Sequence, residues 1–266
     1  MADWETLRDL IAARGINGQV IVSAELGLNH GGHVRRALAL IEAAADAGCQ
    51  AVKVQNYRTG DFVKSRTDTI TIDGQDWNAW QLFADRELDY ETLRRLKDHA
   101  DKCGLIFHST PTNEQGVRDL LRLGCRIIKI ASDVALERDV VRFIRAHAPM
   151  TILSTGCLDC GDDLVTQGWP GQEVVLHCVR EYPTPKEKAN LRRIGELRLV
   201  ASKFAHTLIG YSDHTEGIDC AVAAVRDYKA CWIECHVTLD HTLPGPDHRW
   251  SKNFTQMAEL VRCLKR

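Results

Sequence analysis

The chain has 266 residues, of which 44% are hydrophobic and 26% are charged, a composition typical of a globular protein with a full core. Its 34 Lys and Arg residues against 36 Asp and Glu residues give a net charge of -2, which argues against a basic surface for nucleic acid or a membrane. The first segment, MADWETLRDLIAARG, lacks the basic start and apolar core of a signal peptide, and no run reaches the roughly 20 apolar residues of a membrane span. We therefore expect a cytoplasmic protein.

Short β-branched runs alternate with longer helical segments along the whole chain. The expected strands cover residues 19–24, 51–54, 105–107, 127–130, 151–153, 173–176, 207–209 and 231–234. The expected helices cover residues 34–47, 90–103, 114–123, 138–146 and 218–228. Apolar strands separated by helices indicate a parallel sheet covered on both faces. Such units, repeated over a chain of about this length, favour an α/β fold of the (β/α)8 TIM-barrel type, with residues 1–266 as one domain.

Two glycines and one long segment refine this prediction. Gly48 and Gly104 each follow an expected helix, where glycine suits a left-handed C-terminal cap. Residues 57–87 form the longest stretch without a regular pattern, and long loops in compact domains are often functional. Trp77 and Trp80 in this stretch either line a pocket or attach the loop to the barrel, and we favour attachment.

Almost every expected strand ends in a polar residue. These residues are Glu25, Lys53, Ser109, Thr110, Lys129, Ser132, Ser154, Thr155, His177, Ser212, Asp213, His214 and His236. In a (β/α)8 barrel the active site lies at the C-terminal ends of the strands. The series therefore predicts a ring of functional groups around that end of the barrel.

Lys53 and Lys129 lie inside β-branched runs, where an unpaired ammonium group is costly to bury. One interpretation is a pair of structural salt bridges. The other, which we favour, is an anion site for a phosphate or carboxylate group, completed by hydroxyl groups. The hydroxyl groups expected there belong to Thr110, Ser132, Ser154 and Ser212.

His214 and His236 end neighbouring strands, so their imidazoles are expected to converge. Two such groups can bind a divalent metal with Glu25 or Asp247 in support, although a histidine at a strand end can also serve only as a hydrogen-bonding group. Cys157 and Cys160 form a C-x-x-C pair. No second pair of ligands follows it, so we expect structural thiols, with a redox or metal role as the alternative.

Motifs along the chain resemble the sialic acid synthase family. They are AELGLNHGG (24–32), KVQ (53–55), STP (109–111), KIAS (129–132), LSTG (153–156), LHCVREYPTP (176–185), GYSDHT (210–215) and PGPDH (244–248). That family condenses phosphoenolpyruvate with an N-acylmannosamine-type sugar to give a nonulosonic acid. The resemblance extends over residues 20–260 and implies a transferase of carbohydrate biosynthesis, with a homodimer as a further expectation.

The resemblance also implies roles for individual residues. His214 and His236 would hold Mn²⁺ or Mg²⁺, Tyr182 and Asp247 would contact the sugar or other aldehyde acceptor, and Glu25 would organise this region. The residues implied to hold phosphoenolpyruvate are Lys53, Thr110, Lys129, Ser132, Ser154 and Ser212. Carbon C3 of phosphoenolpyruvate would attack the aldehyde, water would add at C2, and phosphate would leave with cleavage of its C–O bond.

Several positions depart from the family pattern. Val134 stands where the family has a glutamate that helps water attack, and Asp133, one position earlier, is the candidate replacement. Thr112 and Val237 also differ, and we expect all these changes to lie beside the site and to alter the acceptor. We also expect the protein to lack the C-terminal antifreeze-like domain of that family, which adds to the expectation that the acceptor is not N-acetylmannosamine. Two alternatives stay open, namely a barrel aldolase with a lysine Schiff base and a non-catalytic barrel that binds a phosphorylated metabolite.

Overall fold

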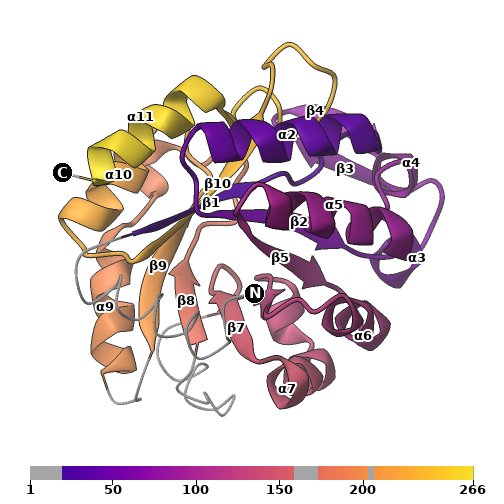
Figure 1. The fold of residues 1–266 in the computed structure, drawn as a ribbon, viewed down its shortest axis with the longest axis horizontal. Coiled ribbons are helices and arrows are strands. Elements are labelled where there is room, and N and C mark those ends of the chain that lie inside the picture. The colour runs from indigo at the N-terminus through magenta and orange to yellow at the C-terminus, as the bar shows by residue number, and fades with distance from the viewer. Residues whose placement is uncertain (1–19, 159–172, 203–206, 266) are drawn as a thin grey trace.

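The computed structural model describes residues 20–158, 173–202 and 207–265, and its centre is a closed barrel of parallel strands (Figure 1). The strands follow one another around the barrel in chain order, and the first pairs with the last to close it. Their bounds are β1 (Ile21–Glu25), β2 (Ala51–Asn56), β5 (Ile106–Pro111), β6 (Ile127–Ile130), β7 (Met150–Ser154), β8 (Glu173–His177), β9 (Leu208–Asp213) and β10 (Trp232–Thr238). Each expected strand overlaps one of these, so the (β/α)8 TIM barrel is confirmed. Gln19, at the start of the first expected strand, lies outside the described residues.

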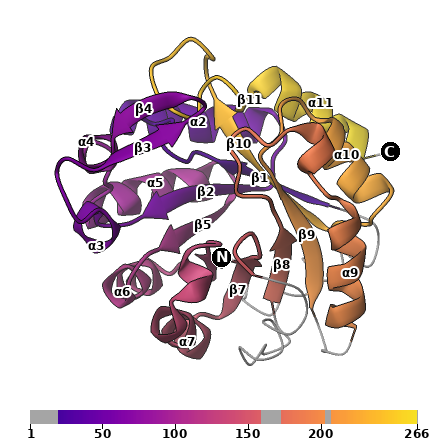
Figure 2. The ribbon, with the colours of Figure 1, turned by 180° about the vertical axis from the view of Figure 1, so that it is seen from behind.

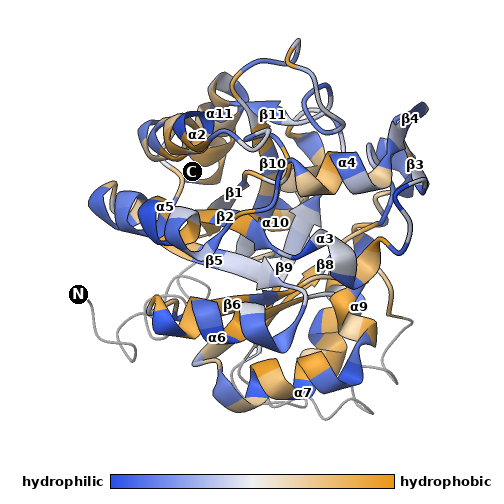
Figure 3. Cartoon of the chain, turned by 90° about the vertical axis from the view of Figure 1, so that its right-hand side faces the viewer, coloured by the Kyte–Doolittle hydropathy of each residue, from blue (hydrophilic) through white to orange (hydrophobic). Residues whose placement is uncertain are grey.

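Helices surround the barrel on its outside, as Figures 1 and 2 show from opposite sides. Their bounds are α2 (Val34–Asp46), α5 (Tyr90–Lys102), α6 (Glu114–Arg122), α7 (Arg138–His147), α9 (Arg192–Ala201), α10 (Asp219–Arg226) and α11 (Phe254–Leu264). Helix α2 buries Ala37, Leu40, Ile41 and Ala44, the spacing of one helix face. Figure 3 shows the same mixture of hydrophobic and hydrophilic residues on α6 and α7. The five expected helices are confirmed, whereas α9 and α11 were not predicted.

Strand alternation divides the core into two parts. Val22, Val52 and Ile128 belong to the large apolar cluster that includes the buried faces of the helices. Ile21 and Ile127 belong to a second cluster, which also contains Trp232 and fills the barrel near the strand starts. They lie one position before Val22 and Ile128 in their strands. Successive side chains of a strand point to opposite faces, so the residues two or four positions beyond Ile21 and Ile127 also point into the barrel. The apolar cluster is therefore the floor beneath the polar strand ends.

The segment after β2 is more regular than the sequence suggested. It contains α3 (Thr59–Phe62), an antiparallel hairpin of β3 (Thr69–Ile72) and β4 (Gln75–Asn78), and α4 (Ala79–Ala84). Asp73 and Gly74 form the turn with positive φ angles of 52° and 71°, and Asp-Gly is a typical hairpin dipeptide. Trp77 packs against the buried cluster of Leu28, Tyr57 and Leu82, as expected for a residue that attaches this segment to the barrel.

Two further expectations can be compared with the fold. Gly48 and Gly104 have φ angles of +82° and +73°, which confirms the predicted left-handed caps of the helices before them. No helix in the described ranges combines the length and the apolar character needed to cross a membrane.

Candidate active site

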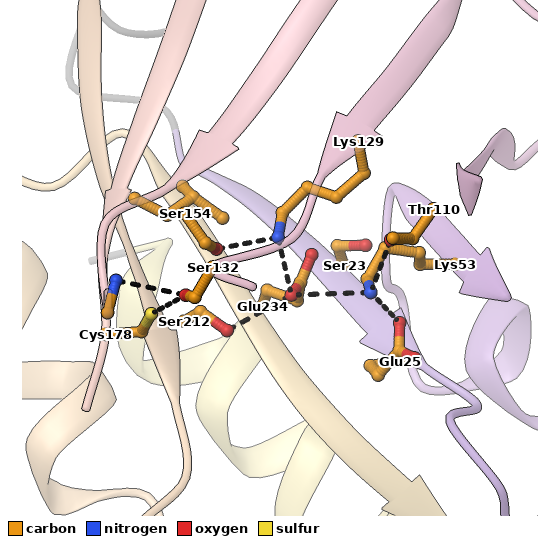
Figure 4. Close-up of polar contacts among 12 residues, drawn as sticks. Ser23, Glu25, Lys53, Thr110, Lys129, Ser132, Ser154, Cys178, Ser212 and Glu234 are labelled. Atoms are coloured by element: carbon orange, nitrogen blue, oxygen red, sulfur yellow. Dashed lines mark hydrogen bonds and ion pairs between the residues drawn. The ribbon is translucent and has the colours of Figure 1, made fainter. Parts of the chain in front are cut away.

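Four charged side chains of alternating sign form a row inside the barrel (Figure 4). Lys53 Nζ lies 2.8 Å from Glu25 Oε2 and 3.8 Å from Glu234 Oε1, and Lys129 Nζ lies 3.6 Å from the same Glu234 oxygen. We call Glu25, Lys53, Glu234 and Lys129 the charged row. All four are buried, because they project into the barrel from β1, β2, β10 and β6.

The charged row shifts the pKa values of its members in different directions. Burial alone would lower the pKa of Lys53, but Glu234 and Glu25 raise it above its ordinary value. Burial would likewise raise the pKa of Glu234, but Lys129 and Lys53 hold it well below the usual range. For Lys129 burial prevails and lowers the pKa, with Glu234 opposing. Burial raises the pKa of Glu25 to about 7, with Lys53 opposing. The two lysines thus favour the ionised form of Glu234, whereas burial favours the protonated form of Glu25, with a pKa of about 7.

Hydroxyl groups line the row, as the sequence predicted. Lys53 Nζ donates a hydrogen bond to Thr110 Oγ1 at 3.3 Å, and Lys129 Nζ donates to Ser154 Oγ at 2.7 Å. Ser212 Oγ donates to Glu234 Oε1 at 3.1 Å.

Ser132 lies at the edge of this group. Its Oγ accepts a hydrogen bond from the backbone amide of Gly156 at 3.0 Å and lies 3.1 Å from Cys178 Sγ. Two buried ammonium groups and several hydroxyl groups therefore share one region, which suits a substrate with more than one anionic group.

The predicted imidazole pair, His214 and His236, lies beside the row, with the ring centroids 5.6 Å apart. His214 Nδ1 lies 2.7 Å from the carbonyl oxygen of Val179, which can only accept, so Nδ1 carries the proton. Nε2 is then unprotonated, and its electron pair lies 3.4 Å from Ser212 Oγ. Burial lowers the pKa of His214 to about 4 and that of His236 well below 6.5, so both imidazoles are neutral at physiological pH.

Two predicted acceptor residues adjoin the imidazole pair. The Tyr182 ring lies 4.3 Å from that of His214 between centroids and is 38% exposed. Asp247 is buried, with one carboxylate oxygen 3.6 Å from His236 Nδ1, and burial raises its pKa to about 6. The structure thus brings a phenol, a carboxyl group and two imidazoles together next to the charged row.

The fit of a divalent metal can be tested on these side chains. Within the described ranges, no group of three or more His, Cys, Asp and Glu side chains is arranged to hold a metal ion. The imidazole pair nevertheless offers neutral nitrogens, and the buried His236 Nδ1 has no hydrogen-bond partner. Imidazole nitrogens bind divalent transition-metal ions, and oxygen ligands such as the neighbouring Asp247 carboxylate or water suit Mn²⁺ and Mg²⁺. The residues therefore fit a metal with two protein ligands, completed by oxygen atoms of substrate or water.

The positions that depart from the family pattern are placed differently from expectation. Val134 and Val237 are buried in the large apolar cluster, so the expectation that they lie beside the substrate is wrong. Val237 alternates with His236 along β10 and points to the helix layer. Asp133 is exposed, and its carboxylate accepts a hydrogen bond from the Val134 amide instead of contacting the charged row. Its catalytic role stays a prediction. Thr112 is half-buried and donates to Asp61 at 3.4 Å.

Some polar strand ends stabilise the fold instead of lining the site. Ser109 Oγ and Thr155 Oγ1 donate to the carbonyl oxygens of Val54 and Leu176. His177 Nε2 bonds to the carbonyl oxygen of Ala189, and the ring stacks on Tyr211. The predicted ring of functional groups is therefore smaller than the full series of polar strand ends.

One central residue was missed from the sequence, namely Glu234. It lies two positions before His236 in β10, so the two side chains point to the same side of the strand. That spacing was the available signal. Cys157 is a free, half-buried thiol, and Cys160 lies outside the described residues, so the role of the C-x-x-C pair stays open.

A closed (β/α)8 barrel with buried ammonium groups, hydroxyl groups and paired imidazoles at its strand ends defines an enzyme for an anionic substrate. The model of the NeuB family matches residues 40–266, and the chain belongs to this family. The predicted enzyme class, a phosphoenolpyruvate-condensing synthase like the sialic acid synthases, is confirmed at this level.

Similar proteins, which include a named synthase, support this assignment. The chain is 35% identical to N,N'-diacetyllegionaminic acid synthase of Campylobacter jejuni, over 93% of this chain and 76% of the relative. It is 33% identical to the spore coat polysaccharide biosynthesis protein SpsE of Bacillus subtilis, over 95% of this chain and 68% of the relative. The crystal structure of N-acetylneuraminic acid synthetase from Leptospira borgpetersenii, a complex with citrate, matches with a TM-score of 0.81 at 31% identity. That match covers 93% of this chain and 83% of the other.

Proposed function

We propose that the charged row binds phosphoenolpyruvate and that the enzyme joins it to an aldose or another aldehyde with release of phosphate. The observation that carries this proposal is the pair of buried ammonium groups, Lys53 and Lys129, held 3.8 Å and 3.6 Å from one carboxylate oxygen of Glu234. Phosphoenolpyruvate carries a carboxylate and a phosphate that repel each other. Two cations fixed on either side of one anion offset that repulsion and hold the donor in one orientation.

The hydroxyl groups orient the two lysine side chains of the donor site. Thr110 and Ser154 already bond to the two lysines, so both ammonium groups are oriented before substrate arrives. Ser132, whose oxygen accepts from the Gly156 amide, can donate its own proton to a phosphate or carboxylate oxygen, and Ser212 can do so by turning its hydroxyl group away from Glu234. Groups oriented in advance need little reorganisation during the reaction, which is the main source of electrostatic stabilisation in enzymes.

The acceptor would lie on the other side of the charged row, against Tyr182 and Asp247. Tyr182 is partly exposed, and one carboxylate oxygen of the buried Asp247 lies 3.6 Å from His236 Nδ1. His214 and His236 would hold Mn²⁺ or Mg²⁺, and this ion would polarise the carbonyl group of the acceptor.

In the proposed reaction, C3 of phosphoenolpyruvate forms a bond to the aldehyde carbon, which leaves positive charge at C2. Water adds at C2, and the C2–O bond to phosphate breaks, giving a 2-oxo acid and inorganic phosphate. Of the two water protons, one ends on the former aldehyde oxygen and the other on phosphate. Glu25, whose pKa burial raises to about 7, is the group best suited to exchange a proton with the reacting centre, while the Glu234 carboxylate stabilises positive charge.

The acceptor itself is proposed as a class only, an aldose or other aldehyde. Val134 and Val237 carry no argument about it, because both side chains lie in the apolar core. Thr112, directly after the end of β5, and the partly exposed Tyr182 remain as residues that can select the acceptor. A homodimer and a cytoplasmic location also remain proposals, testable by light scattering and by cell fractionation.

The experiment supplies phosphoenolpyruvate and Mn²⁺ with a panel of acceptors and follows phosphate release. The panel contains N-acetylmannosamine, its 6-phosphate and unsubstituted aldoses. The proposal expects release that depends on one of these aldehydes, and on one other than N-acetylmannosamine if the acceptor has changed. Binding of phosphoenolpyruvate without consumption in any mixture would instead support a non-catalytic barrel. An amine adduct trapped by borohydride would support a Schiff-base aldolase.

A further inference from the structure

Three consecutive residues after the PGPDH motif are buried almost completely. Two lie in the connection after β10, and the third begins the short strand β11 (Lys252–Asn253), which pairs with β10. Trp250, Ser251 and Lys252 have exposed fractions of 1%, 2% and 0%. Each of them contacts a different part of the candidate active site. We call residues 250–252 the internal clamp.

Trp250 packs against the acceptor side of the site. Its ring centroid lies 4.8 Å from that of His236, 5.7 Å from that of Tyr182 and 6.3 Å from that of His214. The indole Nε1 donates a hydrogen bond to the carbonyl oxygen of Pro246 at 3.2 Å, which fixes the plane of the ring. One buried side chain therefore limits the movement of both imidazoles and of the phenol.

Ser251 fixes the backbone that carries Asp247. Its amide and its hydroxyl group both donate to the carbonyl oxygen of Asp247, at 3.1 Å and 2.6 Å. Asn29, from the loop after β1, donates from Nδ2 to Ser251 Oγ and to the carbonyl oxygen of Val237, both at 2.9 Å. The turn with Asp247 is thus tied to the loop after β1 and to the end of β10.

Lys252 contacts the residue before His214 and the residue after it. Its ammonium group lies 3.1 Å from Asp213 Oδ2 and donates to the carbonyl oxygen of Thr215 at 2.5 Å. Asp213 Oδ1 in turn accepts from the amide and the hydroxyl group of Thr215, at 2.9 Å and 2.8 Å. The Lys252 ammonium group therefore fixes the turn that carries His214, because it contacts Asp213 and Thr215 at the same time.

Stability alone is a poor explanation for the Lys252–Asp213 pair. Both side chains are fully buried, and the desolvation cost of such a pair often equals or exceeds the attraction between its charges. Two well-packed apolar residues would therefore stabilise the fold at least as much as this ion pair does. What a buried ion pair does provide is a fixed direction and distance. Here that fixed distance joins the turn of His214 to the segment that follows Asp247.

We propose that Trp250 and Lys252 are positioning residues, which hold the imidazole pair and Asp247 in the arrangement that binds the metal and the acceptor. This inference rests on the proposed function of the site. Supporting residues of this kind typically change metal affinity or activity by about 10- to 100-fold when they are replaced. The donor residues Lys53 and Lys129 have no contact with the clamp among the bonds of the described residues, so donor binding is expected to stay unchanged.

The first test replaces Asp213→Asn and Lys252→Met together. The asparagine oxygen can still accept from Thr215, and no unpaired charge is left in the core, so only the link across to the clamp is lost. The matched control is Lys186→Met with Asp219→Asn, which removes an exposed ion pair between the segment after β8 and α10. Trp250→Leu and Trp250→Phe form a second pair, in which only phenylalanine keeps an aromatic ring against the imidazoles.

Three quantities are measured on each folded variant, namely the Mn²⁺ dissociation constant by calorimetry, the acceptor KM, and the phosphoenolpyruvate dissociation constant. We expect the clamp double variant and Trp250→Leu to raise the first two by about 10- to 100-fold. We expect the donor constant to change by no more than about twofold, and Trp250→Phe and the exposed-pair control to remain near wild type. If the clamp double variant does not fold, the two Trp250 variants give the answer.

Unchanged Mn²⁺ affinity and acceptor KM in folded variants would overturn the proposal. An equal loss of donor binding would overturn it too, because it would show a general disturbance of the barrel. Failure of the proposed function itself looks different: the wild-type enzyme would release no phosphate with any acceptor, while the Mn²⁺ titration would still report on the clamp.

Discussion

Replacement of Lys129 by methionine tests the donor site most specifically. The Lys129 ammonium group faces one carboxylate, Glu234, and one hydroxyl group, Ser154, so part of its charge is left for a substrate. A hydrogen bond to a charged group contributes about 1.5 to 3 kcal/mol, and about 1.4 kcal/mol corresponds to a factor of ten. Lys129→Met should therefore raise the dissociation constant of phosphoenolpyruvate by about 10- to 150-fold.

Lys53→Met should weaken donor binding less than Lys129→Met does. The Lys53 ammonium group already faces two carboxylates, Glu25 at 2.8 Å and Glu234 at 3.8 Å, so less of its charge is available to the substrate. The double variant Lys129→Met with Glu234→Gln leaves the total charge of the row unchanged. If Lys129 acts by direct contact with the substrate, the double variant should bind phosphoenolpyruvate almost as weakly as Lys129→Met alone does. If Lys129 acts only through the net charge of the charged row, the phosphoenolpyruvate affinity of the double variant should be close to that of the wild type.

The assay is calorimetric titration with phosphoenolpyruvate in the absence of acceptor, together with thermal unfolding of each variant. Methionine retains most of the apolar stem of lysine, so we expect folded proteins with somewhat lower stability. Unchanged phosphoenolpyruvate affinity in both lysine variants would refute the anion site and favour the interpretation of purely structural salt bridges.

Two further predictions concern the imidazole groups. His236→Ala removes one of only two protein ligands of the proposed metal, so Mn²⁺ affinity and turnover should both fall severely; full turnover by this variant after chelation would contradict the metal assignment. His108 donates to or accepts from Ser23 at 2.8 Å inside the barrel, and burial lowers its pKa to about 3. Below pH 6.5 the unfolded imidazole takes up a proton that the folded one refuses, so this group reduces the unfolding free energy by about 2 kcal/mol between pH 8 and pH 5. Urea unfolding of His108→Gln at both pH values should show a pH dependence smaller by about that amount, and equal pH dependence in both proteins would show that the folded histidine is protonated.

The barrel could be predicted because its strands and helices repeat two simple periodicities. The lysines of the site were found for a related reason. Lys53 and Lys129 interrupt apolar runs, where a charge needs an explanation. His214 and His236 were found from their places at neighbouring strand ends.

Other parts of the site depend on contacts between residues far apart in the sequence, which the periodicity of strands and helices does not reveal. Glu234 looked like one more charge in a strand, and only its side of β10, shared with His236, marks it. Trp250 lies in the connection after β10, and Lys252 begins the two-residue strand β11. Nothing local in the sequence indicates that this tryptophan reaches the rings of residues 182, 214 and 236. Val134 and Val237 were placed beside the site because neighbouring residues lie there, but a shift of one position in a strand or turn moves a side chain to the other face.

The central claim is that the enzyme joins phosphoenolpyruvate to an aldehyde and releases phosphate by cleavage of the C–O bond. Phosphoenolpyruvate labelled with ¹⁸O at the bridging position between C2 and phosphorus tests it directly, with the accepted aldehyde and Mn²⁺ present. The account predicts that the label appears in inorganic phosphate, because water supplies the new oxygen at C2. Label retained in the organic product would contradict the proposed chemistry.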